Sequence, residues 1–356
     1  LSDVNDEELQ RIDHKLASDQ INGHEFADAK HPYSYDLDIF GKKSLFLQLN
    51  RTSTQLGKQK LANWVAQKAS KADIRNRQEV IGELSEKLDW RQDFQAIGRF
   101  SDAGTNQVNL LLNWMSKDFQ FDRSPWMYWG SKLFPVISLI GLVLVLTTDV
   151  PTALTLTLAL LPSLLLTKKV SKLIVAVIEE TSDCVQILES YASLIKQIEQ
   201  EEFQHPHLKA LRQKLGVAQS EEKKKKASEA LQKLSQILYH LDLRNNAYFY
   251  AFFIMWTLYD VHWFFALDSW KRKYHQEIAQ WLAVVAEFEA LNSLAGFAYA
   301  NPSFNMPQIS EKEYFLQASN LGHPLLPAHE RVCNDFSLEG KGKTAIITGA
   351  SRGIGK

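Results

Sequence analysis

The sequence has very little cysteine, with only Cys184 and Cys333 among 356 residues. Two thiols this far apart exclude a disulfide-stabilised scaffold and a zinc site built from Cys-x-x-Cys pairs. Such scarcity is typical of a protein that folds in a reducing compartment. We predict that both cysteines are small, buried, apolar side chains.

The chain also lacks an excess of charge of either sign. Its 40 basic side chains balance 41 acidic ones, so the chain as a whole lacks the basic footprint usual in an autonomous nucleic-acid-binding domain, although this balance is compatible with local basic patches. We expect no secretory signal peptide over the polar residues 1–30. The helical part supplies no nucleophile, general base or metal-ligand cluster, so we predict no catalytic residue and no metal site.

Patterns typical of β-strands are scarce, whereas apolar residues recur at helical spacing over most of the chain. They do so over 44–65, 74–88, 170–203, 231–243 and 270–297. Ser70 and Asp73 have the spacing of a capping box that begins a helix. We predict a mainly α fold with long lever helices, one of them a rod of roughly 50 Å over 170–203. Strands are expected only near Phe336 and over 345–348.

Two uncharged runs, Leu133–Thr148 and Pro151–Thr167, stand on either side of Asp149. As helices, each would span roughly 24 to 26 Å, slightly short of a hydrocarbon core of about 30 Å, which local thinning of the bilayer accommodates. The flanking lysines are Lys132, Lys168, Lys169 and Lys172. By the positive-inside rule, both open ends face the cytoplasm and Asp149 lies at the far turn. We predict a transmembrane helical hairpin over 132–169; the alternative is a buried hairpin in a soluble core.

A third apolar stretch, Ala247–Leu267, is aromatic and long enough to cross a membrane. Asp260 and His262 fall within it, where a charge in lipid would be costly. We therefore favour a buried core helix, with both side chains as interior groups, over a third span.

Two blocks far apart in the chain carry a family resemblance. The first contains, in order, Asn50, Arg51, Thr52, Thr54, Gly57, Lys58, Lys60 and Trp64. The second contains Glu287, Glu289 and Leu291–Ala295, followed by Gly322, His323, Pro324, Leu325, Asn334 and Asp335. In this order they resemble the first and last helices of the core of MutS-family mismatch-repair ATPases, and the entry to the ATPase domain.

The resemblance implies a helical core with levers that relay changes between ATP binding and a DNA-binding or partner-binding end. It implies ATP and Mg²⁺ as cofactors of a longer parent protein, and a homodimer formed through an ATPase domain that this fragment lacks. His323, Pro324, Asn334 and Asp335 would belong to the nucleotide site. Because repair proteins of this family are soluble, the apolar hairpin indicates a membrane-associated branch at the cytoplasmic face of the inner membrane. Binding of DNA by this piece alone is expected to be weak.

The last residues depart from that family. A phosphate loop of the ATPase type requires Gly-x-x-x-x-Gly-Lys-Ser/Thr, whereas Gly349–Lys356 reads GASRGIGK. The stretch resembles instead the Thr-Gly-x-x-x-Gly-x-Gly nucleotide loop of short-chain dehydrogenases/reductases, which binds a pyrophosphate. Its members here are Thr348, Gly349, Ser351, Gly353, Ile354, Gly355 and Lys356. We hypothesise that two reading frames were joined at Ala350, leaving an incomplete loop that binds no nucleotide tightly.

Our interpretation is a MutS-like core and lever fragment that is inactive as an enzyme by itself. The alternative is the N-terminal part of an NADP-dependent reductase with a helical extension. The expected organisation is a polar segment (1–39), a first core part (40–131), the hairpin (132–169), levers with a second core part (170–320), and the truncated first strands of an α/β nucleotide-binding domain with a reductase-like tail (321–356).

Overall fold

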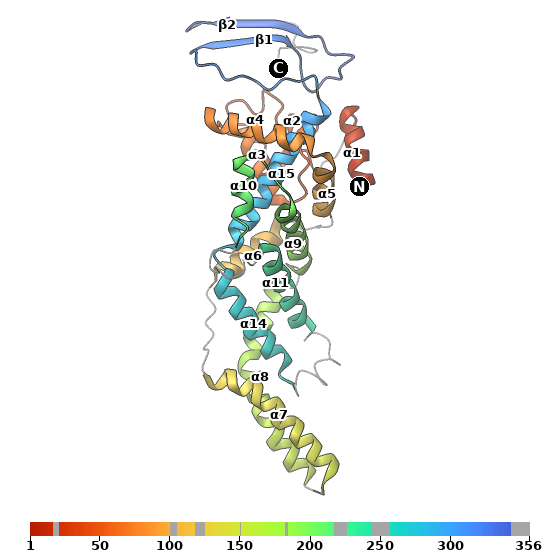
Figure 1. Ribbon diagram of the computed structural model, residues 1–356, viewed down its shortest axis with the longest axis vertical. Helices are drawn as coiled ribbons and strands as arrows, with labels where there is room; N and C mark the ends of the chain where they lie inside the picture. The colour runs from red at the N-terminus through yellow and green to blue at the C-terminus, as the bar shows by residue number, and fades with distance from the viewer. Residues whose placement is uncertain are drawn as a thin grey trace. The chain divides into compact units, whose positions relative to one another are not determined.

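The computed structural model describes residues 1–16, 21–99, 105–117, 125–149, 151–181, 184–216, 226–243 and 257–342. Within these residues the chain is mainly helical, with one antiparallel pair of strands late in the sequence (Figure 1). The predicted mainly α class is confirmed. The chain divides into two compact units. One comprises Leu1–Ser101, Gln200–Lys214 and Ala283–Lys356, and the other comprises Asp102–Glu199 and Leu215–Leu282.

Short helices form most of the first unit. They are α1 (Ser2–Ile12), the 3-10 turn η1 (His24–Phe26), α2 (Leu45–Leu49), α3 (Gln55–Ala66), α4 (Lys71–Glu86), α5 (Leu88–Arg99), α10 (Pro206–Gln213) and the larger part of α15 (Ile278–Ala300). Hydroxyl groups of Ser44, Thr54 and Ser70 set the starts of α2, α3 and α4, because an N-cap oxygen satisfies an N–H group that has no partner within the helix. Thr54 Oγ1 accepts from the Gly57 N–H at 3.1 Å, and Ser70 Oγ accepts from the Asp73 N–H at 3.1 Å. The helix start predicted at Ser70 is confirmed.

The core of this unit joins segments that are distant in sequence. Phe46 and Leu49 of α2 pack with Leu61 and Ala62 of α3 and with Ala290 of α15, all of them buried. Burial of apolar surface contributes roughly 25 cal/mol per Å² to folding. These contacts hold α2 and α3 against α15 and so position the polar groups between them.

The two strands form a hairpin. β1 (Phe315–Leu321) pairs antiparallel with β2 (Asn334–Glu339), from Phe315 opposite Glu339 to Leu321 opposite Asn334, with an irregularity after Ala318. The strand predicted near Phe336 is confirmed as β2. β1 was not expected, and the strand predicted over 345–348 lies outside the described residues.

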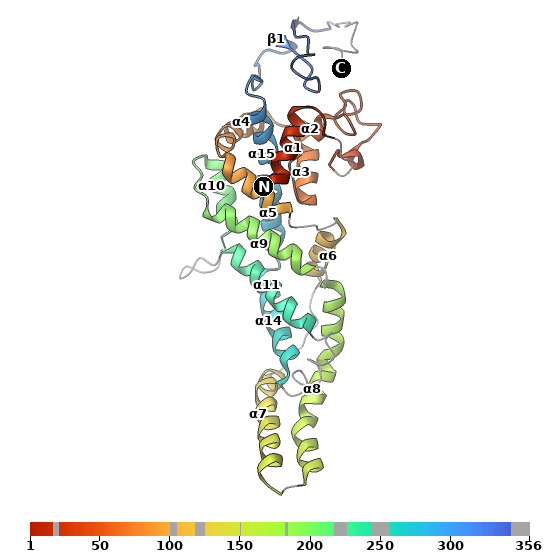
Figure 2. The ribbon, with the colours of Figure 1, turned by 90° about the vertical axis from the view of Figure 1, so that its right-hand side faces the viewer.

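The second unit contains longer helices. They are α6 (Thr105–Ser116), α7 (Pro125–Thr147), α8 (Thr152–Thr181), most of α9 (Val185–Gln200), α11 (Ala227–Asp242) and α14 (Tyr259–Tyr274). α7 and α8 lie side by side in both views (Figure 2). The other helices of the unit close a core in which Leu188, Leu231, Leu234 and Phe264 are fully buried.

Three expectations need correction here. The rod predicted over 170–203 is not one helix, because its residues are shared between α8, which begins at Thr152, and α9. Cys184 is buried as predicted, but Cys333 is exposed, since it lies between the two strands. Asp260 is buried, whereas His262 is exposed at the first turns of α14; residues 247–256 of that predicted helix lie outside the described residues.

Candidate functional site

The two blocks that carry the family resemblance are in contact in the first unit. The backbone N–H of Arg51 donates to Ser293 Oγ of α15 at 3.1 Å, across 242 positions of sequence. The Arg51 side chain runs beside Gly296, where an added Cβ would come within 2.5 Å of Arg51 Cδ. The start of α3 therefore docks on α15 through backbone and side-chain contacts together.

Glu289 of α15 lies at the centre of this contact. Its carboxyl group accepts hydrogen bonds from the backbone N–H groups of Ser53 at 2.8 Å and Thr54 at 2.9 Å, and a short one from the Thr54 hydroxyl. Burial raises the pKa of Glu289 to about 7, although these three donors act in the opposite direction. An acid that changes charge near neutral pH is therefore enclosed where α3 meets α15.

Gly57 permits this close approach. A Cβ added there would lie 2.7 Å from Glu289 Cδ and 2.8 Å from Glu289 Cβ, distances that side chains do not tolerate. Gly98 of α5 likewise permits close approach to the segment that precedes α3, because an added Cβ there would lie 2.5 Å from the Cβ of Ser53. The spacing from Arg51 to Gly57 thus fits the local geometry of a tight joint between helices.

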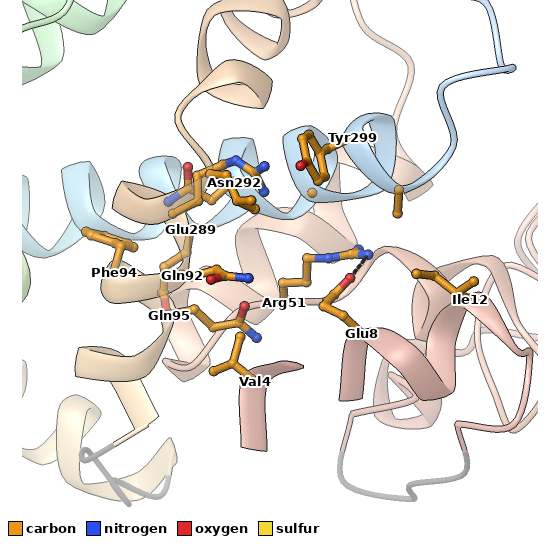
Figure 3. A pocket seen from close by; sticks show the side chains of 14 residues that line it. Val4, Glu8, Ile12, Arg51, Gln92, Phe94, Gln95, Glu289, Asn292 and Tyr299 are labelled. Atoms are coloured by element: carbon orange, nitrogen blue, oxygen red, sulfur yellow. Dashed lines mark hydrogen bonds and ion pairs between the residues drawn. The ribbon is translucent and has the colours of Figure 1, made fainter. Parts of the chain in front are cut away.

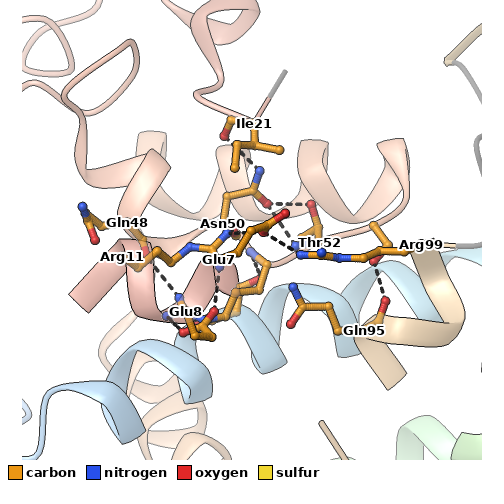
Figure 4. A network of polar contacts seen from close by, with 12 residues as sticks. Glu7, Glu8, Arg11, Ile21, Gln48, Asn50, Thr52, Gln95 and Arg99 are labelled. Carbon is orange, nitrogen blue, oxygen red and sulfur yellow. Dashed lines mark hydrogen bonds and ion pairs between the residues drawn. The ribbon is translucent and has the colours of Figure 1, made fainter. Parts of the chain in front are cut away.

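A network of charged side chains extends the joint to α1 (Figure 4). Glu8 pairs with Arg51 at 2.7 Å and with Arg11 at 2.6 Å, and Arg11 also donates to the Asn50 carbonyl at 2.6 Å. Burial opposes ionisation of Glu8, but Arg51 and Arg11 together hold its pKa below the ordinary value. Asn50 Oδ1 accepts from both the N–H and the hydroxyl of Thr52. Buried charges that are paired in this way fix the orientation of the elements carrying them.

A cavity of about 300 Å³ adjoins the joint (Figure 3). Its walls come from α1, α5, α15 and Arg51, and include Val4, Glu8, Arg91, Gln95, Asn292 and Tyr299. Asn292 is 7% exposed, and neither polar atom of its amide has a hydrogen-bond partner among the described residues. The Arg91 guanidinium donates hydrogen bonds to the carbonyl oxygens of Leu84 at 2.8 Å and Ser85 at 3.1 Å.

The polar groups of this arrangement connect α1, the segment before α3, and α15 to one another. Among the described residues, no group of three His, Cys, Asp or Glu side chains is placed to hold a metal ion. The joint contains the buried acid Glu289 and the ion pair between Arg51 and Glu8. Its closely packed glycines are Gly57, Gly98 and Gly296. Groups of this kind can fix the angle between helices and respond to a change in packing or charge.

The residues predicted for a nucleotide site are only partly described. His323 and Pro324 lie between the strands, where His323 Nδ1 accepts from the Leu325 N–H at 3.3 Å. Asn334 begins β2, and Asp335 Oδ1 accepts from the Asn320 N–H at 2.9 Å. These side chains take part in the β-hairpin. The predicted loop residues (Thr348, Gly349, Ser351, Gly353, Ile354, Gly355 and Lys356) lie outside the described residues.

Sequence reasoning missed Glu8, Arg11 and Asn292. Glu8 and Arg11 belong to a polar helix with weak periodicity, and nothing in that pattern indicates partners at Arg51 or Asn50. Asn292 stands inside the Leu291–Ala295 block, but its burial beside a cavity depends on α1 and α5. Only the family resemblance pointed to Glu289.

A second candidate site, in the other unit, is the surface of the α7–α8 hairpin. Small residues of α7 are buried, among them Ser138 and Gly141, and the Oγ atoms of Ser138 and Ser163 lie 3.5 Å apart. Most large apolar side chains of the two uncharged runs are exposed, whereas Leu166 is buried; the exposed ones are Leu133, Val136, Ile137, Leu139, Ile140, Val143, Leu144, Leu146, Leu154, Leu158, Leu161, Leu164 and Leu165. Small residues inside and large apolar residues outside are the reverse of a water-soluble helix pair and typical of helices packed in lipid.

Two of the described helices are long and apolar enough to cross a membrane. Pro125–Thr147 has a mean hydropathy of 1.9 in its most apolar window, of which only 22% is buried. Ile278–Ala300 reaches 1.2, but 72% of its window is buried, as in a core helix of a soluble protein. Thr152–Lys168 is a shorter apolar helical stretch beside the first. α7 and α8 also carry Pro135 and Pro162 in their interiors, which membrane helices tolerate.

Comparison of the chain with models of protein families, with curated proteins and with solved structures finds no match in any of the three.

The buried acid makes the stability of the joint depend on pH. The pKa of Glu289 is about 7 in the folded chain, against an ordinary value of 4.5. Below pH 4.5 both states hold the proton, and between pH 4.5 and 7 only the folded state does. The free energy of unfolding therefore falls as pH rises through this range, by about 3 kcal/mol in total.

Glu289→Gln should remove this contribution, because an amide of the same shape stays neutral. We expect the difference in unfolding free energy between wild type and E289Q, measured by urea denaturation, to change by about 2 to 3 kcal/mol between pH 5 and pH 8. Glu313→Gln, at an exposed position, is the matched control. Parallel pH profiles for wild type and E289Q would show that Glu289 does not titrate in this way.

Proposed function

We propose that this chain is the helical core and lever region of a MutS-like, membrane-associated protein. In this proposal, the helices couple an ATPase domain, located beyond the described residues, to a DNA-binding or partner-binding end. ATP and Mg²⁺ would serve the parent protein, which would form a homodimer through its ATPase domains. The chain by itself would bind DNA weakly and hydrolyse no ATP.

The contact between the two resemblance blocks is the observation that carries the proposal. Arg51 and Thr54 of the first block meet Ser293 and Glu289 of the second, and Gly57 allows their close approach. A chance likeness of two helical segments has no reason to bring its matching residues into one buried joint. A joint of this kind can carry movement from one helix to the next when a nucleotide is bound elsewhere.

The hairpin supports the membrane part of the proposal. Exposed apolar side chains occur along both α7 and α8, and Asp149 lies between the two helices in the chain. At 1.5 Å per residue, the uncharged residues 133–148 extend over roughly 24 Å, slightly short of a hydrocarbon core of about 30 Å, which local thinning of the bilayer accommodates. Lysines at the open ends favour the cytoplasmic face of an inner membrane by the positive-inside rule.

One observation favours a second candidate, a short-chain reductase that uses NADP. Residues 348–355 read TGASRGIG, the full nucleotide-loop pattern of that family. This candidate depends on eight residues at the end of the chain, and it gives no reason for an exposed apolar hairpin.

Independent amplification and sequencing of the source DNA through codons 340–356 and beyond would separate the two. We expect a strand followed by Gly-x-x-x-x-Gly-Lys-Ser/Thr, with the reductase motif absent. An uninterrupted frame that continues into a complete reductase, with its catalytic Ser, Tyr and Lys, would overturn the proposal.

A titration of the purified chain with duplex and mismatched DNA tests the coupling role of this part. In a gel-shift assay at 150 mM salt, we expect the protein to retard neither DNA at concentrations below micromolar, because the charge of the whole chain is balanced. Tight, mismatch-selective binding would mean that this part itself recognises DNA, which contradicts a pure core and lever role.

A further inference from the structure

We propose that the open end of the α7–α8 hairpin is a binding surface for the headgroups of anionic phospholipids. This inference rests on the proposed membrane association and adds a lipid class to it. The surface, called the collar below, consists of Trp126, Tyr128, Trp129, Lys132, Lys168 and Lys172, all of them exposed.

The pairing of the two helices brings the collar residues to the same end of the hairpin, within about 9 Å along the helix axis. α7 and α8 are antiparallel, and Ser138 lies against Ser163. Six residues before Ser138 is Lys132, and five residues after Ser163 is Lys168, so the two lysines lie at nearly the same depth on neighbouring helices. By the same register, Trp129 lies level with Lys172. The collar residues of both helices therefore lie at comparable depths near the end of the hairpin.

The collar carries positive charge that the described residues do not neutralise. No ion pair joins Lys132, Lys168 or Lys172 to a described carboxylate. The Lys132 ammonium lies 4.5 Å from the centre of the Tyr128 ring and 5.9 Å from that of Trp129, and it donates to the Tyr128 hydroxyl at 2.8 Å. An ammonium has three donors, so Lys132 can still donate a hydrogen bond to a phosphate oxygen. The aromatic rings beside it hold it at the level of the headgroups.

The rest of the hairpin is uncharged up to its turn. Between Leu133 and Thr167 the only ionisable side chain is Asp149, and no Trp, Tyr, Lys or Arg occurs there. Aromatic and basic residues at one end alone match one water–lipid interface, where indole and phenol rings prefer to lie and where anionic lipids attract lysine. A nucleic acid would not explain why the charged band continues directly into exposed leucines such as Leu164 and Leu165.

Flotation of the full chain with vesicles tests the collar. One set of vesicles is phosphatidylcholine alone, and the other contains 30% phosphatidylglycerol. At 50 mM KCl we expect the partition coefficient to be about 100-fold higher on the anionic vesicles, since each of three lysines near the surface contributes roughly fivefold. At 500 mM KCl most of this preference should disappear through screening.

Replacement of the collar lysines, Lys132→Gln with Lys168→Gln and Lys172→Gln, should remove the anionic preference and leave flotation on phosphatidylcholine unchanged. The control, Lys209→Gln with Lys233→Gln and Lys312→Gln, loses the same charge at exposed positions outside the collar and should keep the preference.

Three other results would each overturn the inference, and they differ in what they say of the proposed function. Equal flotation on both vesicles refutes the collar and leaves the membrane association in place. A preference that the collar variant keeps refutes the assignment to these lysines. Flotation on neither vesicle refutes the membrane association itself, and the collar with it.

Discussion

Gly57→Ala is expected to lower the free energy of unfolding of this protein by about 2 to 4 kcal/mol. An alanine in a helix gains up to about 1 kcal/mol over glycine. At this position the added methyl group would lie 2.7 Å from Glu289 Cδ and 2.8 Å from Glu289 Cβ. Either α3 moves away from α15 or Glu289 leaves its donors on Ser53 and Thr54. Overpacking costs roughly 1 to 3 kcal/mol, and each lost hydrogen bond about 1 kcal/mol more.

Gly82→Ala is the matched control, because it makes the same chemical change within a helix. Gly82 lies in α4, and an added Cβ there meets no atom within 4 Å. We expect this variant to be more stable than wild type by roughly 0.5 to 1 kcal/mol. Urea denaturation of the three proteins at one pH measures both effects. If G57A were as stable as G82A, the close contact between α3 and Glu289 would not exist.

The features that the sequence predicted well are those that depend on neighbouring residues. The absence of charge from 133–148 and 151–167 is a local property, and so is the Ser70 cap of α4; the structure has an apolar helix pair over these runs, and the cap at Ser70. The structure starts α7 at Pro125, eight residues before the predicted uncharged run. The aromatic residues Trp126, Tyr128 and Trp129, which carry polar N–H or O–H groups, separate this start from the run of aliphatic residues.

The parts that escaped prediction depend on contacts between distant residues. Arg51 finds Glu8 43 positions earlier and Ser293 242 positions later, and no spacing rule connects them. The raised pKa of Glu289 comes first from burial, which is a property of the assembled helices. β1 is mostly exposed and lacks strict alternation, so the periodicity of Phe315–Leu321 does not mark a strand.

Ile140→Arg together with Leu161→Arg should detach the protein from membranes. Both side chains are exposed, at 54% and 48%, and the register set by Ser138 and Ser163 places them at one level near the middle of the hairpin. An arginine at the centre of a bilayer costs about 2.5 to 3.5 kcal/mol on the insertion scale. Two of them would lower the membrane partition coefficient by a factor of at least about 1,000. Extraction of cell membranes with alkaline carbonate, followed by sedimentation, measures the loss.

The wild-type chain should stay in the carbonate-resistant pellet, and the double variant should move to the supernatant. Leu110→Arg supplies the control, because Leu110 is an apolar residue of α6 with 52% exposure that lies outside the hairpin. It should sediment like wild type. Because the positions chosen face outward, arginine there disturbs no packing between α7 and α8, so a soluble hairpin would tolerate both substitutions without any change in sedimentation. A double variant that remains in the pellet would therefore mean that this apolar face is not in contact with lipid.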